Sequence, residues 1–171
     1  MTRNRSRTLL ASVAALPLVA LAVAGCGSAS SSVSPPTTKD GRAATIGAAN
    51  EGLGKILVNS QGRTLYLFQK DSGTKSECTG ACAANWPPLR ANSPPAIGGG
   101  ANASLVATTM RSDGSRQITY NNHPLYTFVK DTKAGDTNGE GLTAFGGTWY
   151  AISPAGNQVV GQPAGTGGYG Y

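Results

Sequence analysis

Short runs of apolar and β-branched residues, separated by turn residues, fill the middle of the chain, and helical periodicity is nearly absent from them. Such runs predict strands, and the polar stretches between neighbouring runs predict hairpin turns. The predicted strands are "KILVN" from Lys55, "TLYLF" from Thr64, "LVATTM" from Leu105, "RQITY" from Arg116, "PLYTF" from Pro124 and "TWYAI" from Thr148, with turns at 60–62, 112–115 and 121–124. Only "GACAANW", around Cys82, favours a short helix.

One seven-residue phrase occurs twice, as "LYLFQKD" at 65–71 and "LYTFVKD" at 125–131. Each copy aligns further as strand, turn and strand, and each is followed by a tryptophan that begins a new run, Trp86 or Trp149. Self-similarity at a fixed period indicates a duplicated structural unit. We therefore predict two related repeats, about 50–95 and about 104–156, within one compact all-β domain, an antiparallel sandwich or a small barrel.

The repeated phrase also predicts which side chains share a face. Tyr and Phe are two positions apart in each copy, so they lie on one face of a strand. The opposite face has two leucines in the first copy but Leu125 and Thr127 in the second, so we expect it to be only partly covered and the aromatic face to form the core. The motif residues are Tyr66, Phe68 and Asp71 in one copy and Tyr126, Phe128 and Asp131 in the other.

The aspartate of each phrase allows two interpretations. An Asp at a strand exit can bond its own backbone two residues further on and so shape the turn. Alternatively, the two Tyr/Asp pairs form a site for a ligand or a cation.

The N-terminus has the pattern of an export signal. Residues 1–7 contain three arginines, residues 8–23 are almost wholly apolar, and "VAGC" at 23–26 has the small residues and cysteine of a bacterial lipobox. The apolar run is short for a membrane-spanning helix. We predict a signal peptide at 1–25 and a lipid anchor at Cys26; a plain secreted protein cleaved near Ala24 is the alternative.

Composition divides the remaining chain. Residues 26–43 are rich in Ser, Thr and Pro and predict a tether, residues 44–161 predict the β domain, and residues 162–171 predict a flexible Gly-rich tail. Loss of the three signal arginines leaves 11 basic against 8 acidic residues, a formal net charge of +3. These charges are scattered, whereas nucleic-acid binding needs a clustered basic face, so nucleic acid is not an expected partner.

The two remaining cysteines, Cys78 and Cys82, are four positions apart, a spacing that a disulfide tolerates. A structural disulfide is one interpretation. The other is a redox or copper site, because soft thiolates select Cu(I) and His123 could complete the ligand set. The loop 131–141 offers Asp131, Asp136, Asn138 and Glu140 as oxygen donors for calcium, but its spacing does not fit an EF-hand and a polar loop is favoured.

Catalysis by a nucleophile has little support, since Gly-x-Ser-x-Gly is absent and the chain has a single histidine. Exposed aromatic rings could instead stack on envelope sugars. The candidates are Trp86, Trp149, Tyr150, Tyr169 and Tyr171.

The Tyr-x-aromatic-x-x-Asp motif in both copies, with "CTGACAANWPPL" and "GGTWYAISPAG", resembles the bacterial secreted-repeat lipoproteins of unknown function. The resemblance spans most of residues 50–156 and implies an exported, often lipid-anchored, two-repeat protein without an established activity. The sequence thus predicts a lipid-anchored, non-catalytic envelope protein without a cofactor, which binds the membrane through its anchor and an envelope protein or polysaccharide through its domain. The alternative is a redox or copper protein that uses Cys78, Cys82 and His123.

Overall fold

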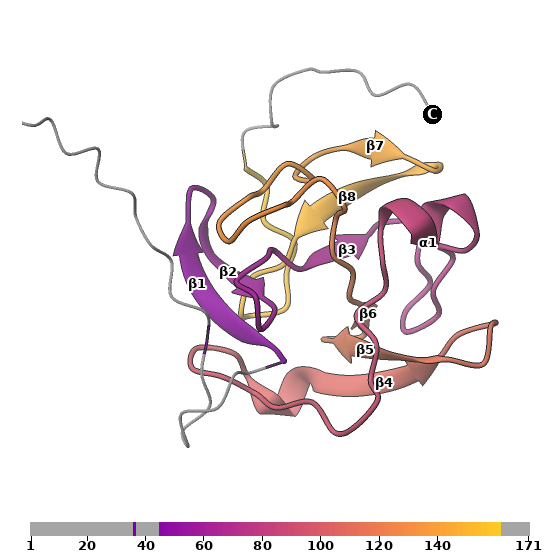
Figure 1. Ribbon diagram of the computed structural model, residues 1–171, viewed down its shortest axis with the longest axis horizontal. Coiled ribbons are helices and arrows are strands. Elements are labelled where there is room, and N and C mark those ends of the chain that lie inside the picture. The colour runs from indigo at the N-terminus through magenta and orange to yellow at the C-terminus, as the bar shows by residue number, and fades with distance from the viewer. Residues whose placement is uncertain (1–35, 37–44, 162–171) are drawn as a thin grey trace, which may run out of the picture. The chain divides into compact units, whose positions relative to one another are not determined.

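The computed structural model describes residue 36 and residues 45–161 (Figure 1). The predicted signal peptide, Cys26, the tether up to residue 43 except residue 36, and the tail lie outside these described residues. The elements are β1 (Gly47–Glu51), β2 (Gly54–Val58), β3 (Tyr66–Phe68), α1 (Ala81–Asn85), a 3-10 turn η1 (Ala103–Leu105), β4 (Val106–Met110), β5 (Arg116–Tyr120), β6 (His123–Pro124), β7 (Thr143–Ala144) and β8 (Gly147–Ala151).

The strands form three small antiparallel sheets in the described part of the chain, with the orders β1-β2, β3-β8-β7 and β4-β5-β6. The predicted antiparallel β domain is confirmed, and so is the single short α-helix near Cys82. The sheets do not close into a barrel. The run at 124–128 is less regular than predicted, because only its first residue belongs to β6 and Tyr126 contributes an isolated bridge.

Turn chemistry fixes the hairpins of the second repeat. The Asp113 carboxylate accepts from the Ser115 N–H at 2.9 Å, and Gly114 has a φ of 77°, so the turn between β4 and β5 uses a side-chain-to-backbone bond and a residue without a Cβ. Asn121 and Asn122 both have positive φ, 47° and 65°. Two successive positive φ values define the tight turn that suits the twist of a hairpin, and Asn tolerates them.

The two repeats cross at their tyrosines. The Tyr66 N–H donates to the Tyr126 carbonyl at 2.9 Å, and the Tyr126 N–H donates to the Tyr66 carbonyl at 3.0 Å. This reciprocal pair joins the same position of the two copies. It therefore marks the centre of a pseudo-two-fold arrangement of the repeats.

Hydrogen bonds on both sides of this centre occur in equivalent pairs. The Leu57 N–H donates to the Ile152 carbonyl at 2.8 Å, and the Ile118 N–H donates to the Leu89 carbonyl at the same distance. The residues after each tryptophan thus pair with the hairpin of the other repeat. The repeats exchange their last segments, so each half of the fold contains chain from both copies.

The exchanged segments enclose two hydrophobic clusters. The first contains the aromatic motif residues with both tryptophans and the disulfide, and the second contains Leu65, Leu67 and Leu125 with their neighbours. These three leucines are at most 3% exposed, and only Thr127 is half-buried. The prediction that the face opposite the aromatic residues is only partly covered is therefore wrong, because Ile118, Tyr120 and Ile152 belong to the cluster on that face.

Candidate functional site

Two tyrosine–aspartate pairs lie at the crossing of the repeats, and each pair joins the two copies; Asp131 is buried and Asp71 is half-buried. Tyr66 Oη donates to Asp131 Oδ2 at 2.6 Å, and Tyr126 Oη donates to Asp71 Oδ2 at 2.8 Å. The sequence did not show which aspartate each motif tyrosine contacts. The structure pairs the tyrosine of one repeat with the aspartate of the other.

The remaining oxygen of each carboxylate holds the loop that follows it. Asp71 Oδ1 accepts from the Glu77 N–H at 2.8 Å, and Asp131 Oδ1 accepts from the Asn138 N–H at 2.9 Å. The expected bond to the backbone two residues further on is therefore replaced by bonds that span six and seven residues. Each carboxylate closes a whole loop and ties it to the other repeat.

Burial changes the acidity of these groups. Desolvation raises the pKa of Asp131 to about 6, although hydrogen bonds from Tyr66 and from Asn138 act in the opposite direction. Desolvation likewise raises the pKa of Asp71 to about 6 against bonds from Glu77 and Tyr126 and the charge of Arg111. Both carboxyls therefore titrate slightly below neutral pH. Burial and the adjacent carboxylates also raise the pKa of both tyrosines, so the phenols remain protonated donors.

The aromatic residues between these pairs form a column of four rings. Trp86 and Trp149 stack at the centre with ring centroids 3.9 Å apart and planes 3° apart. Phe128 stacks on Trp86 at 4.1 Å, and Phe68 stacks on Trp149 at 4.0 Å. In each case the phenylalanine and the tryptophan come from different repeats.

The tyrosines meet the sides of this column. Tyr66 lies edge-on to Trp86 at 5.4 Å, and Tyr126 lies edge-on to Trp149 at 5.1 Å. Gly139 approaches the same rings closely, since a Cβ at this position would lie 2.7 Å from Trp86 and 2.8 Å from Tyr66. A side chain at position 139 would therefore displace the column.

Both tryptophans are fully buried, so the prediction that they stack on envelope sugars is wrong. The burial of the tryptophans could not be predicted from the hydrophobic pattern, because each tryptophan begins a run next to turn residues. Tyr150 is half-buried, and Tyr169 and Tyr171 lie outside the described residues.

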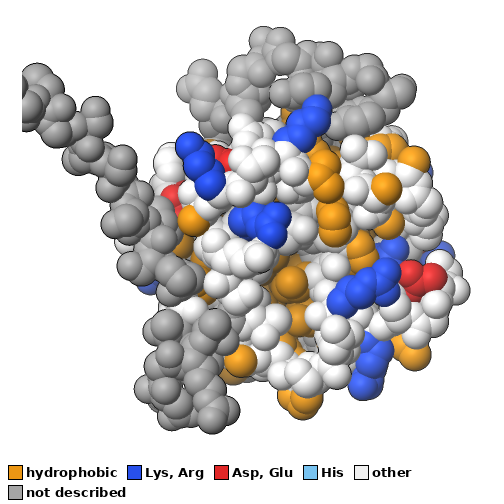
Figure 2. All heavy atoms as spheres, viewed as in Figure 1, with side chains coloured by type: hydrophobic (Ala, Val, Ile, Leu, Met, Phe, Trp, Pro, Cys, Tyr) orange, Lys and Arg blue, Asp and Glu red, His pale blue; other side chains and the backbone are white. Residues whose placement is uncertain are grey.

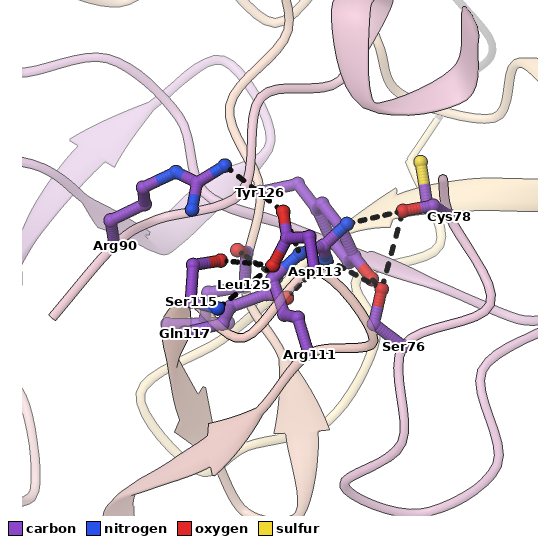
Figure 3. A network of polar contacts seen from close by, with 9 residues as sticks. All are labelled: Ser76, Cys78, Arg90, Arg111, Asp113, Ser115, Gln117, Leu125 and Tyr126. Atoms are coloured by element: carbon purple, nitrogen blue, oxygen red, sulfur yellow. Dashed lines mark hydrogen bonds and ion pairs between the residues drawn. The ribbon is translucent and has the colours of Figure 1, made fainter. Parts of the chain in front are cut away.

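A buried arginine extends the polar network from Tyr126 to the disulfide (Figure 3). Arg111 Nη1 donates to Ser76 Oγ at 2.7 Å and to Gln117 Oε1 at 2.6 Å, and its Nη2 donates to the Cys78 carbonyl at 2.6 Å. Ser76 Oγ lies 2.7 Å from Tyr126 Oη and donates to it, because the phenol proton is already bonded to Asp71. The sequence did not single out Arg111, Ser76 or Gln117. Their residue types follow no repeat pattern, and only the fold brings them together.

Cys78 and Cys82 form the predicted disulfide, with Cα atoms 5.2 Å apart. Cys78 is fully buried and Cys82 is 6% exposed. The bond closes the turn before α1 and thereby positions Trp86. With both sulfur atoms in a disulfide, neither is a thiolate ligand for copper in this state of the protein.

In the acidic loop at 131–141, Asp136 and Glu140 accept hydrogen bonds from backbone N–H groups of the loop and of β8. Asp136 Oδ2 accepts from the Thr132 and Lys133 N–H groups at 2.9 and 3.0 Å, and Glu140 Oε2 accepts from the Ala151 N–H at 2.7 Å. Across residue 36 and residues 45–161, no group of three or more His, Cys, Asp or Glu side chains is arranged to hold a metal ion.

A polar cavity of about 340 Å³ lies beside one of the Tyr/Asp pairs. Phe68 and Leu67 form its apolar lining, and its polar lining consists of Asp71, His123, Gln69, Asn157 and Gln158. Burial lowers the pKa of His123, which favours the neutral imidazole. The cavity thus gathers the single histidine, one motif aspartate and three amide side chains from both repeats.

A larger cavity of about 470 Å³ lies between residues 91–95 and β4, and no motif residue lines it. Its only charged lining residue is Arg116. On the face shown in Figure 2 the Lys and Arg side chains are spread among polar and apolar atoms and do not gather into a patch. The cavity beside Asp71 is therefore the better candidate site.

These features define a two-repeat β domain with a shared aromatic core. In comparisons with known protein families, residues 47–90 and 107–153 match the family described as a secreted repeat of unknown function. The matches cover more than half of the chain, and the chain belongs to this family of exported proteins. No curated protein and no solved structure matches it. Among the described residues, no helix is long and apolar enough to span a membrane.

Proposed function

We propose that this protein is anchored by lipid at Cys26 on the outer side of the cell membrane and that its domain is a non-catalytic module that binds envelope polysaccharide. The signal-like N-terminus, "VAGC" and the Ser/Thr/Pro-rich stretch support the anchor. Membership of a secreted family supports export. The cavity beside Asp71 supports binding.

The composition of this cavity is the observation on which the binding proposal rests. Gln69, Asn157 and Gln158 offer amide donors and acceptors, and neutral His123 offers one of each. Hydroxyl and acetamido groups of a sugar are matched by such uncharged partners. A few convergent polar groups over an apolar floor are typical of ligand sites.

The binding proposal is tested by sedimenting isolated envelope polysaccharide with the full exported chain, from Cys26 to Tyr171, in detergent. We expect Asn157→Ala combined with Gln158→Ala to weaken cosedimentation about tenfold, as expected from the loss of one or two net hydrogen bonds. Asn92→Ala combined with Ser93→Ala, in the larger cavity, is the matched control and should bind normally. Equal binding by all three proteins, or retention only of an envelope protein, would contradict the proposal.

The anchor proposal predicts that Cys26→Ser blocks lipidation and releases the protein from membranes or stops its maturation. The β domain should still fold, because position 26 precedes the predicted domain. Membrane fractionation with phase partitioning measures the first effect, and circular dichroism of the released chain measures the second. Unchanged membrane retention of the variant would refute the anchor.

A further inference from the structure

The core places two kinds of oxidisable ring in one connected group. Trp86 and Trp149 are in stacking contact, and Tyr66 and Tyr126 each meet one of these indoles edge-on. Tryptophan and tyrosine are the side chains that lose single electrons most readily among the aromatic residues. Ring separations of this size allow electrons to pass between neighbouring rings.

The two kinds of ring differ in what can take their proton. The indole Nε1 atoms of Trp86 and Trp149 are buried without a hydrogen-bond partner among the described residues. The phenols of Tyr66 and Tyr126 instead donate to the carboxylates of Asp131 and Asp71. An oxidised indole therefore keeps its proton and its positive charge, whereas an oxidised phenol can pass its proton along an existing hydrogen bond.

We propose that this core is a one-electron relay in which oxidation of the tryptophan pair ends on a tyrosine. A one-electron oxidant at the surface takes an electron from Trp149 or Trp86 and leaves an indole radical cation. The adjacent tyrosine fills this hole with one electron, and its O–H proton passes to the bonded aspartate. The products are a neutral tyrosyl radical, a protonated carboxyl and the restored indole. One electron from a reductant and return of the proton regenerate the starting state.

The structure provides a point of entry. Phe68 lines the cavity beside Asp71 and stacks directly on Trp149 at 4.0 Å. An oxidant in this cavity lies beside a residue whose buried ring stacks on the tryptophan pair. This inference goes beyond the binding function and does not depend on it, because any small oxidant can reach the same surface.

The loop bonds from Glu77 and Asn138 require the carboxylates, but neither these bonds nor close packing requires the phenols. Phenylalanine in place of Tyr66 would fill the same space and would free Asp131 from the core, where burial of its charge is costly. The arrangement nevertheless occurs twice, and each carboxylate accepts from a tyrosine that touches an indole. A relay gives the bond between phenol and carboxylate a role that packing and loop closure do not.

The test is laser flash oxidation of the full exported chain with tris(bipyridine)ruthenium(III) as the oxidant. Tyr150, Tyr169 and Tyr171 are first replaced by Phe, so that tyrosines outside the core do not contribute. We expect an indole radical that decays as a tyrosyl radical appears, seen by transient absorption and electron paramagnetic resonance. Tyr66→Phe combined with Tyr126→Phe should abolish the tyrosyl signal and lengthen the life of the indole radical about tenfold or more.

Tyr120→Phe is the matched control. Tyr120 is fully buried, but its Oη donates to the Pro154 carbonyl and accepts from the Asn102 N–H, so no carboxylate can take its proton. This variant should behave like the parent. The relay would be overturned by a tyrosyl signal that survives replacement of Tyr66 and Tyr126. It would also be overturned by an indole radical with the same lifetime whether or not these tyrosines are present.

The pH dependence gives a second measurement that needs no further substitution. The transfer should slow as the pH falls from 7.5 to 5, because a protonated aspartate no longer accepts. Asp71 faces Tyr126, Glu77 and Arg111 and lines the cavity with His123, and Asp131 faces Tyr66, Asn138 and Asp136. Transfer at the same rate throughout this range would show that these carboxylates do not take the proton.

Discussion

Neither repeat, produced alone as residues 44–100 or 101–161, should give a folded monomer, whereas a mixture of the two should recover the native fold. Each hairpin pairs with the segment that follows the tryptophan of the other copy, as in the bonds from Leu57 to Ile152 and from Ile118 to Leu89. A single repeat would leave these backbone groups unpaired and would expose half of the aromatic column. Loss of so many buried contacts exceeds the stability of a small domain.

Dispersion of amide signals in nuclear magnetic resonance spectra measures this effect, and sedimentation equilibrium reports the oligomeric state. A folded dimer of one repeat would still agree with the prediction, because two identical copies could exchange segments. A well-dispersed spectrum from a monomeric single repeat would contradict it. The full domain at 44–161, cut only between residues 100 and 101, is the control that shows the break itself is tolerated.

The sequence predicted the strands and the duplication but could not predict the crossing. Residue spacing shows that Tyr66 and Phe68 share a strand face, and the second copy repeats the pattern. Nothing in that pattern states whether Asp71 bonds Tyr66 or Tyr126. The choice depends on backbone pairing between segments about sixty residues apart, and local periodicity carries no information about such pairing.

The elements missed from the sequence share a physical cause. β1, "GAANE", consists largely of small and polar residues without β propensity, and it forms because Gly54 allows a tight turn onto β2. β7 has only two residues and depends on its pairing with β8. In both cases a stronger neighbouring strand imposes the extended conformation.

The candidate site was predicted in part. The disulfide and the motif residues follow from spacing and repetition, and the structure brings Asp71 and His123 to one cavity although 52 positions separate them. Arg111 was missed because a single arginine at a strand end has the pattern of a solvated residue. Its 7% exposure results from the disulfide loop, whose Cys78 carbonyl accepts from it.

The domain should become more stable as the pH is lowered from 7.5 to about 5. Desolvation raises the pKa of Asp71 and of Asp131 from an ordinary value near 3.8 to about 6. The folded state therefore keeps these protons over a range in which the unfolded chain has lost them. Their stabilising contribution is complete below about pH 4 and is lost as the pH rises through about 6.

The expected change in the free energy of unfolding is on the order of 1–3 kcal/mol for Asp131, with a smaller value for the half-buried Asp71. Burial also raises the pKa of Glu140, which acts in the same direction. Burial lowers the pKa of His123, which opposes the trend, so the comparison is made in a His123→Gln background. Urea unfolding at several pH values measures the slope of the free energy of unfolding against pH.

Asp131→Asn should remove the largest part of this slope, because an amide does not titrate. Asp113→Asn is the matched control. Bonds from Ser115 lower the pKa of Asp113 to about 2, so its own contribution is present above about pH 4 and is lost only below the range tested. Stability that stays level from pH 5 to 7.5 in the His123→Gln protein and falls only below about pH 4 would mean that hydrogen bonds from Tyr66 and Tyr126 stabilise the carboxylates more than burial destabilises them. Such a result would place both pKa values below 4 and make the crossed pairs a net source of stability at neutral pH.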